Sequence, residues 1–304
     1  MQETGDLRPA NAGCRVRDWI QHIRQSAIPN SKSPIPNPPP NHRRRGLSLI
    51  ELLVATTILA LIAGALAALA SAVQVGSQYN AGMGNALQHG RVGTERIQRA
   101  LNEAPASNEF PGFLVLEEQI GIWKFPDTLV VWRPPGDPAN PDGLPLISEL
   151  VVFCPDPAAG NRLLEITVPA DTRPVPAVDD LPAWQSTVFG MKTSGDARRV
   201  LLTDLLRMAM PTGVAGQTAT PRGVARFQVE LRPSEAQWND FLAGALTWDE
   251  IAWAQDIHGT QSGLRQSWCR FELQLIADHV NDNSVDAGIP FFGTGAIYYS
   301  LQRP

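Results

Sequence analysis

The chain has 304 residues and a formal net charge of −5, and this charge is unevenly distributed. Residues 1–46 contain eight Lys/Arg and three Asp/Glu, a net charge of +5, which leaves −10 for the other 258 residues. An acidic body argues against a nucleic-acid-binding surface, whereas a basic head before an apolar run is typical of a membrane protein that keeps its positive charge in the cytoplasm.

The basic head has the composition of an unstructured segment. The stretch NSKSPIPNPPPN at 30–41 contains too many prolines for a helix or a central strand. Apolar sequence begins at Leu47, and residues 52–73 contain no charge. As a helix these 22 residues would be about 33 Å long, close to the roughly 30 Å hydrocarbon core of a bilayer. The sequence therefore predicts one membrane-spanning helix.

Apolar residues continue at helical spacing beyond the membrane part, as far as Pro105, which ends the pattern. We expect a helix over 47–104 whose membrane part covers about 47–75. Four glycines lie between residues 80 and 93, and each costs about 1 kcal/mol relative to alanine. Because of these glycines, which are Gly82, Gly84, Gly90 and Gly93, the helix is expected to bend or loosen near 80–93.

The rest of the chain is expected to form short strands and loops. Runs rich in β-branched and aromatic residues predict strands at 128–134, 147–154, 162–168, 224–232, 268–276 and 296–302. Alternation of apolar and polar residues in 268–276 indicates an antiparallel sheet with one wet face. The stretches 200–210 and 234–255 have helical character, and Ser234 is a candidate N-cap for the second.

The predicted fold class is therefore α+β. A long N-terminal membrane-spanning helix packs on a mainly antiparallel β-sheet domain that carries a Trp-rich helical insertion. We expect three parts: residues 1–46 as a cytoplasmic leader, disordered and cleaved; 47–104 as the N-terminal helix; and 105–304 as an exported, β-rich globular domain.

The junction between leader and helix reads RRRGLSLIELL from Arg43. A plain signal anchor explains the arginines and the apolar run, and a secretory signal could be cleaved after it, within ALAALASAVQ at 65–74. Neither explains a glycine directly before the run or a glutamate five residues after that glycine. A carboxylate deep in a membrane costs roughly 2 to 3.5 kcal/mol, so Glu51 needs a reason.

Gly46, the apolar residues after it and Glu51 resemble the N-terminal signal of type IV pilins and of the pseudopilins of type II secretion. The resemblance covers residues 43 to about 75. It implies a pilin-like fold, cleavage after Gly46 by a prepilin peptidase on the cytoplasmic face, and N-methylation of Leu47. It also implies that Glu51 pairs with the N-terminal ammonium of an adjacent subunit during assembly. The alternative for Glu51 is that it lies at interface depth and reaches water.

Departures from the family pattern suggest which kind of subunit this is. Leucine rather than phenylalanine follows the cleavage site, the leader is long, and the membrane helix lacks proline. The missing proline and the large body favour a minor pilin or pseudopilin. Its expected partners are other subunits, contacted through the N-terminal helix, the prepilin peptidase, the inner-membrane assembly machinery and, before assembly, membrane lipid; no direct nucleic-acid partner is expected. The alternative is a binding module or enzyme that uses the helix only as a tether.

Three further features of the body invite a functional hypothesis. Cys154 and Cys269 fall in predicted strands and could form a disulfide in an oxidising compartment, or stay buried as free thiols. The loop at 277–288 is a weak calcium candidate through Asp278, Asp282 and Asp286; a solvated turn is favoured, because the spacing is not that of an EF-hand.

The third feature is the tryptophan group in 234–255, formed by Trp238, Trp248 and Trp253. Core packing of the insertion is favoured over a carbohydrate or partner surface. The sequence contains no GxSxG, HExxH or GxxxxGK[ST] motif. We therefore assign no catalytic residue, no cofactor and no enzymatic activity.

Overall fold

The computed structural model describes residues 46–120, 123–210, 221–277 and 288–304. The chain divides into two units, residues 1–63 and 64–304. The described part of the first unit is the start of α2 (Leu49–Asn102), and its side chains are exposed. Among the described elements, α2 is the one helix long and apolar enough to cross a membrane. The predicted long N-terminal helix is thus confirmed.

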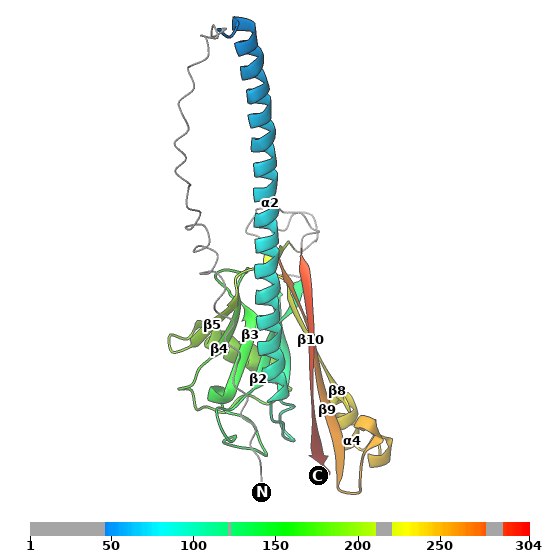
Figure 1. Ribbon diagram of the computed structural model, residues 1–304. Coiled ribbons are helices and arrows are strands. Elements are labelled where there is room, and N and C mark those ends of the chain that lie inside the picture. Colours follow the sequence, from blue (N-terminus) through cyan, green and yellow to red (C-terminus); the bar gives the residue numbers. More distant parts are fainter. Residues whose placement is uncertain (1–45, 121–122, 211–220, 278–287) are drawn as a thin grey trace, which may run out of the picture. The chain divides into compact units, whose positions relative to one another are not determined.

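In the second unit, α2 packs against two antiparallel sheets through a face of small and apolar residues (Figure 1). The helix continues without interruption through 80–93, so the predicted loosening is wrong. One of them, Gly90, serves close packing instead. A Cβ at Gly90 would overlap the ring of Phe291, whereas one at Gly93 would make only an ordinary contact with Leu273. At Gly90 the helix backbone therefore lies closer to Phe291 than a larger residue would allow.

The larger sheet has the strand order β1-β2-β3-β4-β5, with every neighbouring pair antiparallel. Its strands are β1 (Phe113–Ile120), β2 (Trp123–Trp132), β3 (Leu150–Pro155), β4 (Leu163–Thr167) and β5 (Arg198–Thr203). Alternate residues face α2 and α3 (Leu181–Thr193), so the central strands are buried on both sides. This double burial explains why β3 reads as an unbroken apolar run.

The second sheet has the order β10-β9-β8 and consists of β8 (Ala225–Arg232), β9 (Ser262–Leu275) and β10 (Ile289–Gln302). Buried and partly exposed residues alternate along β9, which confirms the predicted wet face. A short hairpin of β6 (Met208–Ala209) and β7 (Arg222–Gly223) completes the described strands. The α+β class with antiparallel sheets is therefore as predicted.

The predicted Trp-rich insertion consists of α4 (Glu235–Leu242) and two 3-10 turns, η2 (Trp248–Glu250) and η3 (Ala254–Asp256). The Ser234 hydroxyl accepts the Gln237 N–H at 3.2 Å, so the predicted N-cap is confirmed. Trp248 and Trp253 are buried against Leu301, and each indole N–H donates to a backbone carbonyl. Core packing, rather than a carbohydrate surface, is what these two rings provide.

A second local prediction is wrong, and one helix was missed. Residues 200–210 were expected to be helical, but they contain β5 and β6. The leucine pairs there have a spacing that also fits a helix, but hydrogen bonding to β4 makes the first part of this stretch a strand. The helix α3 was not predicted, although its start carries the usual signals: the Asp180 carboxylate accepts the Ala183 N–H at 3.1 Å, and proline follows in the first turn.

Candidate processing and assembly site at the start of the long helix

The residues around the predicted cleavage site are not helical. Gly46, Leu47 and Ser48 precede the first turn of α2, and all three are exposed. The Ser48 carbonyl accepts the first helical hydrogen bond, from the Leu52 N–H at 3.1 Å, so Ser48 is the N-cap. The Gly46–Leu47 peptide bond therefore lies just outside the helix, between two exposed residues.

Glu51 takes part in a capping box with Ser48. Its carboxylate Oε2 accepts the Ser48 N–H at 2.9 Å, and the Ser48 hydroxyl accepts the Glu51 N–H at 3.3 Å. Sequence reasoning singled out Glu51 but not Ser48, although S-x-x-E before an apolar run is the signature of this cap. Within the described part of the chain, the other carboxylate oxygen, Oε1, has no partner.

Two threonines are the next polar residues of the apolar run. The hydroxyls of Thr56 and Thr57 both donate to the Leu53 carbonyl, at 3.0 and 2.8 Å. Their hydrogen-bonding needs are therefore met inside the helix, which makes them compatible with lipid. Glu51 is the residue of this stretch that retains an unused charged oxygen.

The two body cysteines are both free and buried. They belong to different hydrophobic clusters, since Cys154 packs on the α3 side of the larger sheet and Cys269 packs with α2. Burial raises the pKa of each thiol to about 12, so both stay protonated and unreactive near neutral pH. The structure does not bring this pair together.

The weak calcium candidate at Asp278, Asp282 and Asp286 lies outside the described residues. Within the described ranges, no group of three His, Cys, Asp or Glu side chains is placed to hold a metal ion.

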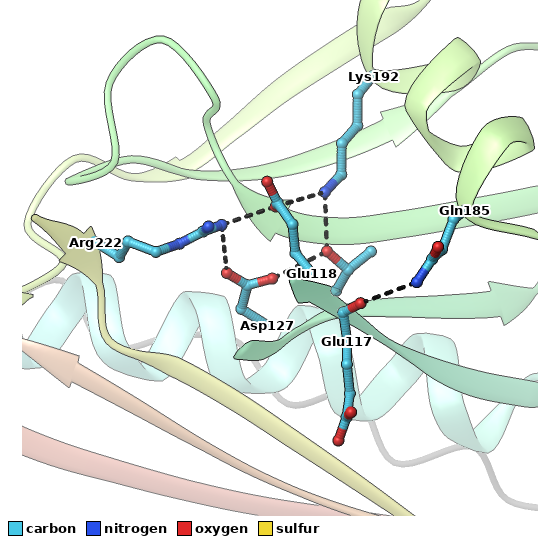
Figure 2. A network of polar contacts seen from close by, with 7 residues as sticks. Glu117, Glu118, Asp127, Gln185, Lys192 and Arg222 are labelled. Atoms are coloured by element: carbon cyan, nitrogen blue, oxygen red, sulfur yellow. Dashed lines mark hydrogen bonds and ion pairs between the residues drawn. The ribbon is translucent and has the colours of Figure 1, made fainter. Parts of the chain in front are cut away.

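The described part of the body contains one compact charge network (Figure 2). Arg222 of β7 donates to Glu118 of β1 and to Asp127 of β2, both at 2.8 Å, and lies over the Phe125 ring. Lys192 of α3 donates to the Thr128 hydroxyl at 2.9 Å and lies 3.9 Å from Glu118. Two cations and two carboxylates thus join β1, β2, α3 and β7.

Burial and the two cations act on these carboxylates in opposite directions. Burial raises the pKa of Asp127, and the positive charges of Arg222 and Lys192 offset this effect only in part. Burial also acts to raise the pKa of Glu118, but the hydrogen bond and charge of Arg222, together with Lys192, outweigh it and lower that pKa. Every member has an opposite charge beside it, so the arrangement suits a structural clamp better than a catalytic site.

Comparison with known proteins supports the N-terminal site. Residues 41–67 match the family model of the prokaryotic N-terminal methylation motif, a span that contains Gly46, Leu47 and Glu51. No curated protein and no solved structure matches the chain. The family match and the one apolar helix fit a single-pass anchor in the inner membrane. The chain carries the prepilin-type signal of type IV pilins and pseudopilins at its N-terminus.

Proposed function

We propose that the chain is a structural subunit of a type IV pilus or a type II secretion pseudopilus, and that it is a minor pilin or pseudopilin. The observation that carries the proposal is the methylation motif at 41–67, with Glu51 in the fifth place after Gly46. A prepilin peptidase cleaves after Gly46 and methylates the new amine of Leu47. Residues 1–46 are the cytoplasmic leader, the helix up to about 104 is the anchor and assembly element, and 105–304 is the exported domain.

The local structure supports cleavage at this bond. Because α2 begins only at Leu49, the peptidase meets a non-helical backbone at Gly46, where the absence of a side chain allows close approach. Cleavage there leaves the apolar helix intact as an anchor. It also creates an ammonium on Leu47, two residues before the helix begins and close in sequence to the Glu51 carboxylate.

Mass spectrometry of the mature N-terminus tests the proposal. We expect N-methyl-Leu47 as the first residue of the protein recovered from the membrane. An intact leader, or cleavage within 65–74, would instead support a tethered binding module or enzyme, and the proposed function would fail.

The assembly role of Glu51 gives a separate prediction. Glu51→Ala and Glu51→Lys are expected to be cleaved largely as the native chain is, but to be incorporated poorly into the fibre, because the neighbouring subunit's ammonium loses its carboxylate. The measurement compares the processed fraction in the membrane with the amount in sheared fibres. Ser48→Ala is the matched control, since it removes half of the capping box and keeps the carboxylate. Normal incorporation of both Glu51 variants would contradict the pairing.

A further inference from the structure

The outer edge of the three-stranded sheet is formed by β10, a strand of 14 residues that pairs with β9 on one side only. Exposed strand edges attract other strands, and proteins normally protect them with charged residues, prolines or bulges. The other edge strands of the two larger sheets follow this rule. Their charged residues are Glu117 and Glu118 in β1, Arg198 and Arg199 in β5, and Arg226, Glu230 and Arg232 in β8.

β10 has no charged residue along its whole length, and its pairing with β9 contains no bulge. Its proline, Pro290, lies at the beginning of the strand. Two large side chains on its solvent-facing side are well exposed, Phe292 at 69% and Tyr298 at 49%. By composition, β10 resembles an interior strand, although its position is at an edge.

Two hydrogen bonds reveal which backbone groups of β10 face outward. The Thr294 carbonyl accepts from the Gln98 side chain at 3.4 Å, and the Gln302 N–H donates to the Asn108 side chain at 3.3 Å. On the other side, the Arg303 N–H donates to the carbonyl of Gln261, the residue before β9, so the odd-numbered positions bond toward β9. In an antiparallel pair, residues alternate between bonding to the partner strand and pointing away from it. The even-numbered residues of β10 thus present both N–H and C=O at the free edge.

This outward row is largely unused. Among the described residues, nothing hydrogen-bonds to the outward backbone groups of Phe292, Ala296, Tyr298 and Ser300. Pro290, which lacks an N–H, belongs to the same even-numbered row, so its missing donor does not weaken the pairing with β9. Apart from the Thr294 carbonyl, the residues from 292 to 300 offer donors and acceptors at strand spacing over roughly 26–27 Å.

We propose that β10 is a strand-addition site for an extended, uncharged segment of a partner polypeptide. The backbone row dictates an extended occupant, because only a strand can match donors and acceptors at alternate residues. Because β10 carries no charged side chain, it offers no electrostatic attraction to a charged peptide. Beside Phe292 and Tyr298, apolar and β-branched side chains form the most favourable cross-strand neighbours. This inference does not depend on how the N-terminus is processed.

The test uses the full chain in detergent and a fluorescein-labelled ten-residue peptide of alternating threonine and valine. We expect saturable binding by fluorescence anisotropy. A ten-residue polyproline peptide should not bind, because it lacks backbone N–H donors on both edges. Hydrogen exchange at single-residue resolution should show new protection at the amides of 292, 294, 296, 298 and 300, while the odd-numbered amides are protected already.

The variant Ala296→Pro removes one outward N–H and places a ring at the free edge, so peptide binding should weaken about tenfold. Ala296→Ser keeps that N–H and is the matched control. Proline already occurs at an even-numbered position of β10, at Pro290, so a second even-numbered proline is compatible with the pairing to β9. Near-UV circular dichroism checks that the variant is folded. If Ala296→Pro does not fold, Ser300→Pro replaces it.

No saturable binding, or protection outside the even-numbered amides, would overturn the proposal. Concentration-dependent protection of the same amides without peptide, together with a dimer in analytical ultracentrifugation, would also overturn it, because a second copy of the chain would then be the occupant.

Discussion

Replacing Arg222 with leucine is expected to lower the free energy of unfolding by about 3 kcal/mol, the lower end of the range for breaking a buried ion pair. The Asp127 side chain is 4% exposed, and Arg222 is its nearest cation. Without Arg222, the charged Asp127 carboxylate stays buried, with only the more distant Lys192 as a cation near it. Urea unfolding of the full chain in detergent, followed by tryptophan fluorescence, measures the loss.

The matched control is Arg226→Leu. Arg226 belongs to the next strand, is 67% exposed and lies 3.9 Å from Glu272. Removing such a surface pair changes stability by less than about 0.5–1 kcal/mol. Equal losses for the two variants would show that the buried network has no special role. Asp127→Asn combined with Arg222→Leu should recover part of the loss, because the buried charge is then gone.

The loss in Arg222→Leu should shrink as the pH falls from 7 toward about 3, first as Asp127 and then as Glu118 becomes protonated. In the native protein the pKa of Glu118 is lowered, so its stabilising contribution is present above its unfolded pKa and is lost as pH falls through the folded value. The pKa of Asp127 is already raised by burial, and removing Arg222 raises it further. At acid pH both carboxyls become neutral and need no cation. A deficit that stays constant across this range would contradict the electrostatic explanation.

The N-terminal site could be predicted from sequence because its parts are local. Gly46, Ser48 and Glu51 lie within six residues, and the contacts that join Ser48 and Glu51 are those of a single helical turn. The apolar run after them has one physical solution in a membrane, a helix. For the same reason, the start of α2 agrees with the prediction to within two residues.

The body was less predictable because long-range pairing determines it. Residues 200–210 carry leucines at helical spacing, yet the first of these residues pair with β4 and form the edge strand β5. The charge network joins residues 118, 127, 192 and 222, and no spacing in the sequence predicts that these residues come into contact. Likewise, Cys154 and Cys269 both lie in strands as expected, but each faces a different cluster, which alternation within one strand cannot reveal.

The glycines of α2 provide the clearest correction, and they give the second large effect. Gly90→Leu is expected to destabilise the body by about 3 kcal/mol or more, because the new side chain meets the Phe291 ring in a packed interface. Gly84→Leu is the control in the same helix. Nothing lies within 4 Å of a Cβ added at Gly84, so this change should stabilise the helix by up to about 1 kcal/mol.

The opposite signs of these two substitutions separate packing from helix propensity. If the glycines of α2 only weakened the helix, both leucine variants would be stabilised, and the argument for close packing would fail. A double-mutant cycle with Phe291→Ala gives the final test. Removing the ring creates room for a side chain at position 90, so Gly90→Leu should cost at least about 1 kcal/mol less in the Phe291→Ala background. If the losses in stability are additive, contact with Phe291 is not the reason why residue 90 must be glycine.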